Sequence, residues 1–241
     1  MYYDYTYLIF VLPAVLLSLW ASAMVKSRFA RYDKVKCKRN ITGAQAAQYL
    51  LKVNGIDDVR IAHIPGNLTD NYNPQTKVLS LSDSTINSTS IAAIGVAAHE
   101  TGHAIQHAKN YKPLGLRRTL VPVANIGSRF GPMMVILGVI AGAAAKASLW
   151  SELGLYVAYA GIALFSLSVL FYLVTLPVEF NASNRALKIL AKANVMDKDE
   201  LKGTKKVLGA AAMTYVASAL TAIGSLLRLL FILNSNNRRK R

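Results

Sequence analysis

Four long apolar stretches dominate the hydropathy pattern of the chain. Residues 7–25, 153–178 and 207–227 are uncharged runs of 19, 26 and 21 residues, and residues 130–150 carry one charge, Lys146. A helix needs about 20 apolar residues to cross the hydrocarbon core of a bilayer. The pattern therefore predicts a first membrane span at 7–25 and an antiparallel hairpin of two spans over 130–178, with a short loop around Lys146.

The last apolar run, residues 207–227, gives conflicting signals. Its length suits a span, but a span would place the basic tail, residues 238–241, on the outer side, against the usual bias of basic residues toward the cytoplasm. A helix that lies on the membrane or re-enters it would keep the tail inside. We expect a membrane-associated helix, and the choice between the two courses stays open.

Two helices are predicted between the first span and the hairpin. Thr42, followed three residues later by Gln45, forms a capping box that predicts a helix over 43–53. A second helix is expected over 91–109, after three residues that can cap it: Ser88, Thr89 and Ser90. Two residues should end it: Pro113 and Gly115.

Two short strands are predicted before the second helix. Residues 59–63 and 76–81 have strand-like patterns and are separated by turn-forming residues, which predicts a hairpin. The second strand is brief and partly polar, as an exposed edge would be. Such an edge can pair with an extended peptide, or it can be an ordinary covered edge, and the pattern does not separate the two.

Charge and composition favour a membrane protein. Hydrophobic residues make up 53% of the chain and its formal net charge is +16. Because the basic residues lie beside apolar runs, anionic lipid head groups explain them better than nucleic acid. The basic cluster within residues 26–39 and the lysines of 188–206 predict that these segments face the cytoplasm. The single cysteine, Cys37, excludes an intramolecular disulfide and a cysteine-based metal site.

The predicted helix over 91–109 carries the candidate chemistry. His99 and His103 are four residues apart, so they lie on one helical face, and Glu100 is next to the first histidine. This spacing is typical of zinc hydrolases, in which the histidines bind the metal and the glutamate acts as general base. The alternative is a histidine pair satisfied by hydrogen bonds. Small residues such as Gly102 are expected to let a substrate backbone approach.

A catalytic zinc site requires a third protein ligand. His107 is excluded, because it lies about 12 Å from His99 along the helix axis. A lone histidine is more often structural than functional, so His63 is interpreted as a structural residue and not as the third ligand. Glu152 falls on the wrong side of the membrane if the hairpin forms, and three carboxylates in a basic loop resemble a solvated surface: Asp197, Asp199 and Glu200.

Glu179 remains as the candidate third ligand. It directly follows the 153–178 run and precedes a helical stretch over 180–193, so the predicted hairpin returns it to the side of His99. The alternative is that Glu179 is a carboxylate that caps the N-terminus of this helix.

Three segments of the sequence resemble one family. The stretch around the histidines, the upstream residues 66–82 and the downstream residues 177–187 are similar to membrane-associated neutral zinc metallopeptidases of the YugP type. More distantly, the chain resembles the HtpX-like and CAAX prenyl protease group. The resemblance implies His99, His103 and Glu179 as zinc ligands and Glu100 as the base.

The chain departs from the distant relatives at one position. They carry an aspartate four residues after the ligand glutamate, where this chain has Ser183. A carboxylate there would orient a histidine ligand, and Ser183 or Asn181 would do so more weakly. We therefore assign no residue to this role. Two residues are candidates to stabilise the oxyanion: Arg185 and His63.

These observations predict a mainly α integral membrane protein with a zincin-like cytoplasmic metallopeptidase core, a short β-hairpin and three to four membrane helices. Residues 1–25 would be the N-terminal anchor, 26–129 the first catalytic segment and 130–178 the transmembrane hairpin. Residues 179–206 would supply the third ligand, and 207–241 a membrane-associated helix and basic tail.

The function predicted is that of a zinc-dependent endopeptidase in the bacterial plasma membrane. It would be multi-pass, with one Zn²⁺ per chain, its site on the cytoplasmic side and peptide or protein substrates that include membrane proteins. We expect no nucleic-acid partner, and the sequence leaves the oligomeric state open. The alternative is a non-enzymatic membrane scaffold with a structural zinc or histidine site. A transporter has little support, because the predicted spans lack ionisable residues in their middles.

Overall fold

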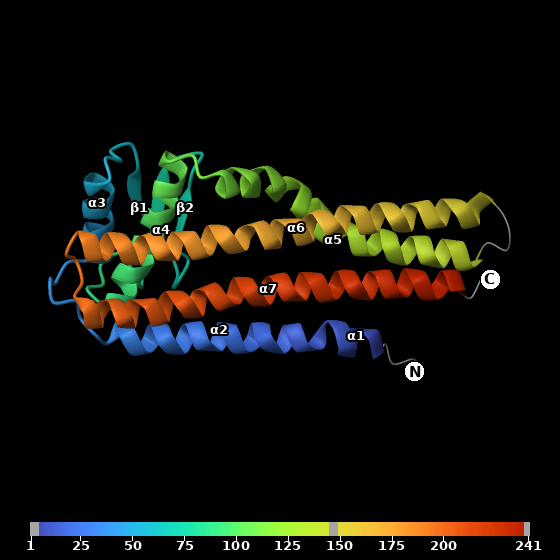
Figure 1. Cartoon of the computed structure of the whole chain (residues 1–241), viewed down its shortest axis with the longest axis horizontal. Coiled ribbons are helices and arrows are strands. Elements are labelled where there is room, and N and C mark those ends of the chain that lie inside the picture. The colour runs from blue at the N-terminus through green and yellow to red at the C-terminus, as the bar shows by residue number, and fades with distance from the viewer. Residues whose placement is uncertain (1–4, 145–148, 239–241) are drawn as a thin grey trace. The chain divides into compact units, whose positions relative to one another are not determined.

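The computed structural model describes residues 5–144 and 149–238 (Figure 1). The chain is mainly helical, as predicted. The helices are α1 (Tyr5–Phe10), α2 (Leu12–Asp33), α3 (Gly43–Val53), α4 (Ile91–Ala108), α5 (Lys112–Ala144), α6 (Leu149–Lys192) and α7 (Lys198–Arg238), and the strands are β1 (Arg60–Ile64), β2 (Asn71–Asn73) and β3 (Val78–Ser82). The predicted loop at Lys146 and residues 239–241 of the basic tail lie outside the described residues.

The chain divides into two units. The first, here the helical unit, comprises the described parts of Met1–Trp20, Gly115–Leu176 and Tyr215–Arg241. The second, here the sheet unit, comprises Ala21–Leu114 and Pro177–Thr214. The candidate site residues of α4 and α6 all belong to the sheet unit.

Glycines bring α5 and α6 close together in the helical unit. A Cβ atom at Gly138 would lie 2.4 Å from the carbonyl oxygen of Gly154, and one at Gly131 would lie 2.9 Å from the carbonyl oxygen of Gly161. Residue numbers rise along α6 as they fall along α5. The two helices are therefore antiparallel, as the predicted hairpin requires.

Three helices of the described chain are long and apolar enough, by length and composition, to cross a membrane. They are Lys112–Gly142, Glu152–Lys192 and Lys198–Ser235. The last contains the 207–227 run, which therefore has the length of a span. The predicted first span falls on α1 and α2, which are not among the three.

The sheet of the sheet unit has the strand order β1-β3-β2. β3 pairs parallel with β1, with Arg60 opposite Val78, and antiparallel with β2. The predicted hairpin of the first and third strands is therefore wrong, and so is the edge position of residues 77–81. Leu79 and Leu81 are fully buried, which explains why this strand takes the centre of the sheet.

Helix α4 lies between two hydrophobic clusters of the sheet unit. Ile94 and Ala98 pack with residues of α3, α6 and α7, and Ala97 and Ile105 pack with residues of α3 and the sheet. Both sides of the helix are thereby covered, and burial of apolar surface on each side stabilises its position. A helix fixed in this way is a rigid support for the side chains that point from it.

Side chains cap the helices of the sheet unit as the sequence predicts. The Thr42 hydroxyl accepts from the Gln45 amide at 3.2 Å, and the Gln45 side chain accepts from the Thr42 amide at 2.9 Å, which completes the capping box of α3. The Ser90 hydroxyl accepts from the Ala93 amide at 3.1 Å and caps α4. Helix α4 ends at Ala108 and is capped by Lys109, within one residue of the predicted bound. The residues expected to end it are wrong, because Pro113 and Gly115 both lie inside α5.

Candidate metal centre

The backbones of α4 and α6 approach closely at Gly102. A Cβ atom at Gly102 would lie 2.6 Å from the carbonyl oxygen of Ala182, closer than such atoms can come. Helix α6 can therefore pack this closely against α4 only because Gly102 has no side chain. The sequence prediction that this glycine makes room for a substrate backbone is wrong at this contact.

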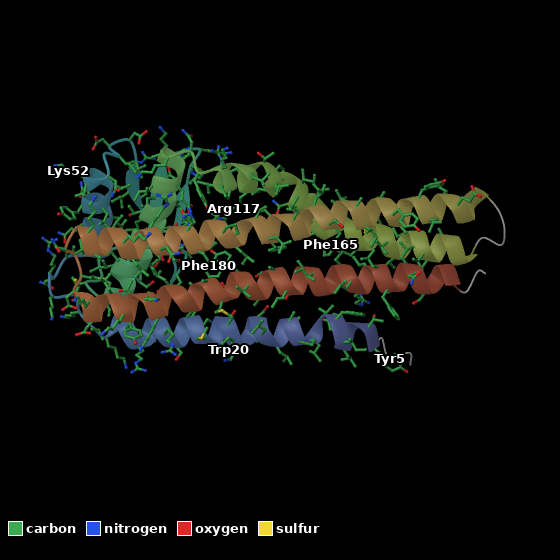
Figure 2. The ribbon with its side chains drawn as sticks, in the orientation of Figure 1. Tyr5, Trp20, Lys52, Arg117, Phe165 and Phe180 are labelled. Carbon is green, nitrogen blue, oxygen red and sulfur yellow. The ribbon has the colours of Figure 1, made fainter. Side chains whose placement is uncertain are left out.

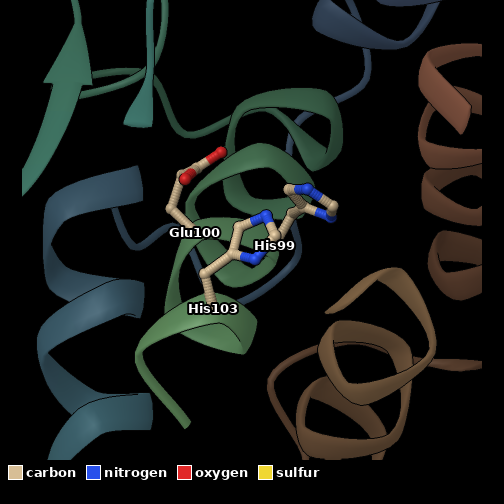
Figure 3. Close-up of side chains that lie close together, drawn as sticks. All are labelled: His99, Glu100 and His103. Atoms are coloured by element: carbon tan, nitrogen blue, oxygen red, sulfur yellow. The ribbon is translucent and has the colours of Figure 1, made fainter. Parts of the chain in front are cut away.

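This approach brings Glu179 to the histidine pair. His99 Nε2 lies 3.2 Å and His103 Nε2 3.5 Å from the same oxygen, Glu179 Oε2. The two imidazoles lie side by side on α4, with the Glu100 side chain next to them (Figure 3), and their ring centroids are 4.8 Å apart. Two nitrogen donors and one carboxylate oxygen thus converge.

Glu179 lies inside α6, in the C-terminal third of a helix that runs without a break from Leu149 to Lys192. The alternative interpretation, a carboxylate that caps a helix beginning at residue 180, is therefore wrong. The apolar run and the following helical stretch are one helix. The side chain of Glu179 is 2% exposed, so a buried carboxylate is held in place by the rigidity of this helix.

The other ring nitrogens of the two histidines also have partners. His99 Nδ1 lies 3.1 Å from the hydroxyl of Ser183, and His103 Nδ1 lies 3.0 Å from Gln106 Oε1. A hydrogen bond at Nδ1 orients an imidazole and leaves Nε2 to face the metal. Ser183 thus occupies the position that the sequence left unassigned.

Gln106 is the residue that sequence reasoning missed. It is fully buried, and it lies three residues after His103, so both side chains emerge on the same side of α4. The three-residue separation of His103 and Gln106 is the feature of the sequence that could have identified Gln106 as a partner of this histidine. Asn181, the other candidate for this position, contacts Gln106 at 3.0 Å instead of a histidine.

Burial sets the electrostatics of Glu100. It raises the pKa of this carboxyl above its ordinary value, although the nearby His103 and His99 imidazoles oppose the rise. For His103, burial lowers the pKa of the imidazole, but the contact with Glu179 and the charge of Glu100 outweigh burial and raise it. The two carboxylates therefore create a site that favours positive charge.

The remaining candidates have other partners. Tyr72 Oη lies 2.9 Å from His107 Nδ1, and His63 Nε2 lies 2.5 Å from Asp83 Oδ1. Arg185 Nε donates to Asn181 Oδ1 at 2.6 Å. None of these contacts is made with His99 or His103 directly, and Arg185 is connected to His103 only through Asn181 and Gln106.

The expectation of a solvated acidic loop is wrong for Glu200. It is only 7% exposed, and its carboxylate accepts from the backbone amides of Lys38 and Asp197 at 2.7 and 2.8 Å. Asp197 Oδ1 accepts from the Glu200 amide at 2.9 Å in return. The two residues form a capping box at the start of α7, which explains their presence structurally.

The donor set fits a zinc ion. Two imidazole nitrogens and one carboxylate oxygen, with a further position left open, are one of the ligand sets of catalytic zinc sites in peptidases. His99, His103 and Glu179 supply this set, and ligand atoms of His99, Glu100 and His103 lie within 4.8 Å of one another. The hydrogen bonds at both Nδ1 atoms match the support that such ligands require.

Comparison with known proteins agrees with this geometry. Residues 7–234 match a family described as "Putative neutral zinc metallopeptidase". The chain belongs to this family. It is also 42% identical to a Bacillus subtilis (strain 168) protein named "Putative membrane protease YugP" over 226 residues, which are 94% of this chain and 96% of that protein. No solved structure matches. The resemblance of the sequence to YugP-type neutral zinc metallopeptidases is confirmed, and the family implies zinc and peptide or protein substrates.

Proposed function

We propose that the protein is a zinc-dependent endopeptidase anchored in the membrane. The observation that carries the proposal is the convergence of two histidine Nε2 atoms on one oxygen of Glu179, at 3.2 and 3.5 Å, with the buried Glu100 beside them. His99, His103 and Glu179 would hold one Zn²⁺ per chain. The family match supports the choice of metal.

Zinc, when bound, supplies Lewis acidity, which makes water a stronger acid and polarises a carbonyl group. Glu100 provides the proton transfers. Its carboxylate takes a proton from the water whose oxygen attacks the peptide carbonyl carbon, and it returns that proton to the leaving nitrogen as the C–N bond breaks. A pKa raised by burial suits this role, because a base with a higher pKa accepts a proton more readily.

The membrane assignment of the proposal rests on the apolar helices. Three of the described helices have the length and composition of spans, and the similar Bacillus protein is named a membrane protease. The basic segments 26–39 and 188–206 support a cytoplasmic site in a multi-pass protein of the bacterial plasma membrane. The sheet unit would be the zincin-like catalytic core, and the bilayer would contact the helical unit.

A comparison of the wild type with Glu100→Gln tests the catalytic role. Glutamine keeps the shape of the side chain but cannot accept the proton, so kcat/KM on an unfolded protein such as casein should fall about 10²- to 10⁴-fold. Zinc content, measured by metal analysis, should stay near that of the wild type. Chelation of the metal should abolish hydrolysis, and added zinc should restore it.

Glu179→Gln tests the third ligand, with Glu200→Gln as the matched control. Both residues are buried glutamates of the sheet unit, but only Glu179 faces the histidines. We expect zinc loss in the first variant and normal zinc content in the second. Full hydrolysis after metal removal would contradict the proposal. Full complementation of a deletion strain by Glu100→Gln would favour a scaffold.

A further inference from the structure

Gln106 occupies a fully buried position in the sheet unit, between α4 and α6. Its side-chain oxygen lies 3.0 Å from His103 Nδ1. Its side-chain nitrogen lies 2.8 Å from the carbonyl oxygen of Val178 and 3.0 Å from Asn181 Oδ1. All three polar contacts of this amide therefore lie within the protein.

These partners determine the orientation of the amide. A backbone carbonyl oxygen only accepts hydrogen bonds, so the Gln106 NH₂ group must face Val178. Arg185 Nε donates to Asn181 Oδ1 at 2.6 Å, which identifies that atom as an acceptor as well. The oxygen of Gln106 then faces His103, and it can only accept.

The orientation fixes the tautomer of His103. Because Gln106 Oε1 accepts, His103 Nδ1 must carry a proton. In the neutral ring the lone pair then lies on Nε2, which is the atom that faces Glu179 at 3.5 Å. A metal ligand must present this lone pair.

The same amide also holds the helix that carries the third ligand. Its two acceptors on α6, Val178 and Asn181, are on either side of Glu179 in the sequence. A single buried side chain therefore orients one histidine and ties it to the turn of α6 from which Glu179 points.

We propose that Gln106 is a positioning residue for the metal centre, which sets the Nε2 lone pair of His103 and the placement of Glu179 together. This inference rests on the proposed function. Ser183 differs, because its hydroxyl beside His99 Nδ1 can either donate or accept. Ser183 orients His99 without selecting its tautomer, so its loss should weaken zinc binding less than the loss of Gln106.

The test is the zinc dissociation constant of the full chain in detergent, measured by competition with a chelator. Gln106→Met keeps the side-chain length but removes the amide, and we expect zinc binding about 10- to 100-fold weaker. The Co²⁺-loaded variant should also show a changed d–d absorption spectrum. Thr101→Val is the matched control, because Thr101 is fully buried on α4 and, among the residues that the structure describes, its hydroxyl bonds only to its own helix, at the Ala97 carbonyl.

Double variants test the connection to α6. Asn181→Ala alone should weaken zinc binding about 10-fold, and the double variant with Gln106→Met should bind zinc about as weakly as Gln106→Met alone, because both changes break one chain of contacts. Ser183→Ala and Gln106→Met act on different histidines, so their effects should multiply. If Gln106→Met does not fold, as judged by circular dichroism of the metal-free protein, Asn181→Ala decides the question.

Four outcomes contradict the inference. The inference is overturned if folded Gln106→Met has the zinc affinity and the Co²⁺ spectrum of the wild type. It is also overturned if Asn181→Ala binds zinc as tightly as the wild type. In both cases the proposed function stands as long as the wild type binds zinc. An equal loss in Thr101→Val would show a general packing effect and overturn it too. A wild-type chain that binds no zinc would overturn the proposed function and this inference with it.

Discussion

The two units differ in how far their large apolar side chains are exposed. In the helical unit, large hydrophobic side chains are exposed along α1, α2, α5, α6 and α7, and Tyr5 and Trp20 are labelled examples (Figure 2). In the sheet unit, large hydrophobic residues are mostly inside, in the clusters on both sides of α4. Exposed apolar surface of this extent is typical of helices that contact lipid.

The units also differ in their use of polar side chains. In the helical unit, serine and threonine hydroxyls mostly bond to carbonyls of their own helix, as Ser166 does to Ile162, and Ser168 on α6 bonds to the Ala124 carbonyl of α5. In the sheet unit, polar side chains cap helices and connect separate elements, as Gln106 does. The difference teaches that close backbone packing stabilises one unit, whereas directional hydrogen bonds shape the site in the other.

The largest effect is expected from Gly102→Val, which would move α6 away from α4. The first added carbon already lies 2.6 Å from the Ala182 carbonyl oxygen, so Glu179 should be displaced from the histidines. We expect a loss of at least about 10-fold in zinc affinity, together with a cost of about 1–3 kcal/mol in stability from overpacking. Chelator competition and thermal unfolding measure the two effects.

Gly209→Ala is the control for this variant. Gly209 lies on α7 in the sheet unit, and a Cβ atom there would meet nothing within 4 Å. This variant should bind zinc normally and be as stable as the wild type or up to about 1 kcal/mol more stable, since alanine favours a helix over glycine. Normal zinc binding by Gly102→Val would refute the proposed role of this contact.

A smaller effect is expected from Gly138→Val in the helical unit. The added Cβ atom would lie 2.4 Å from the carbonyl oxygen of Gly154, so the α5–α6 packing should loosen at a cost of about 1–3 kcal/mol. Zinc affinity should not change, because the site lies in the sheet unit. Thermal unfolding in detergent measures the loss of stability, and zinc titration measures the affinity. Gly115→Ala is the control, because a Cβ atom there would meet nothing within 4 Å. Zinc loss in Gly138→Val would show that the units depend on each other.

The smallest effect is expected from Ser90→Ala, which removes the N-cap of α4. The Ser90 hydroxyl accepts from the Ala93 amide at 3.1 Å and donates to Asp33 at 2.7 Å. Its loss should lower the free energy of unfolding by about 1 kcal/mol, measured by thermal denaturation. Ser90→Thr keeps the hydroxyl and should lose less. An equal loss in both variants would argue against the capping contribution.

Local features of the sequence were sufficient for much of the site. The spacing of His99 and His103 defines one helical face, and the capping box at Thr42 is a contact between near neighbours. Glu179 could be selected because it follows an apolar run on the expected side of the hairpin. Each of these inferences depends on residues close together in the chain or on the length of one segment.

Features that depend on distant segments could not be predicted in the same way. The central place of β3 results from the burial of Leu79 and Leu81 against the rest of the sheet unit, which a five-residue pattern does not show. The contact of Gly102 with Ala182 joins residues 80 positions apart. The burial of Glu200 could not be predicted, because one of its partners, the backbone amide of Lys38, is 162 residues away in the sequence.

The position of Glu179 within an unbroken helix has a consequence for variation in chain length. One residue inserted into α6 between Glu179 and Ser183 would rotate one of them by about 100° relative to the other. Glu179 and Ser183 could then no longer both face His99. Insertions and deletions among relatives should therefore occur in the turns around the sheet, while this part of α6 keeps a constant number of residues.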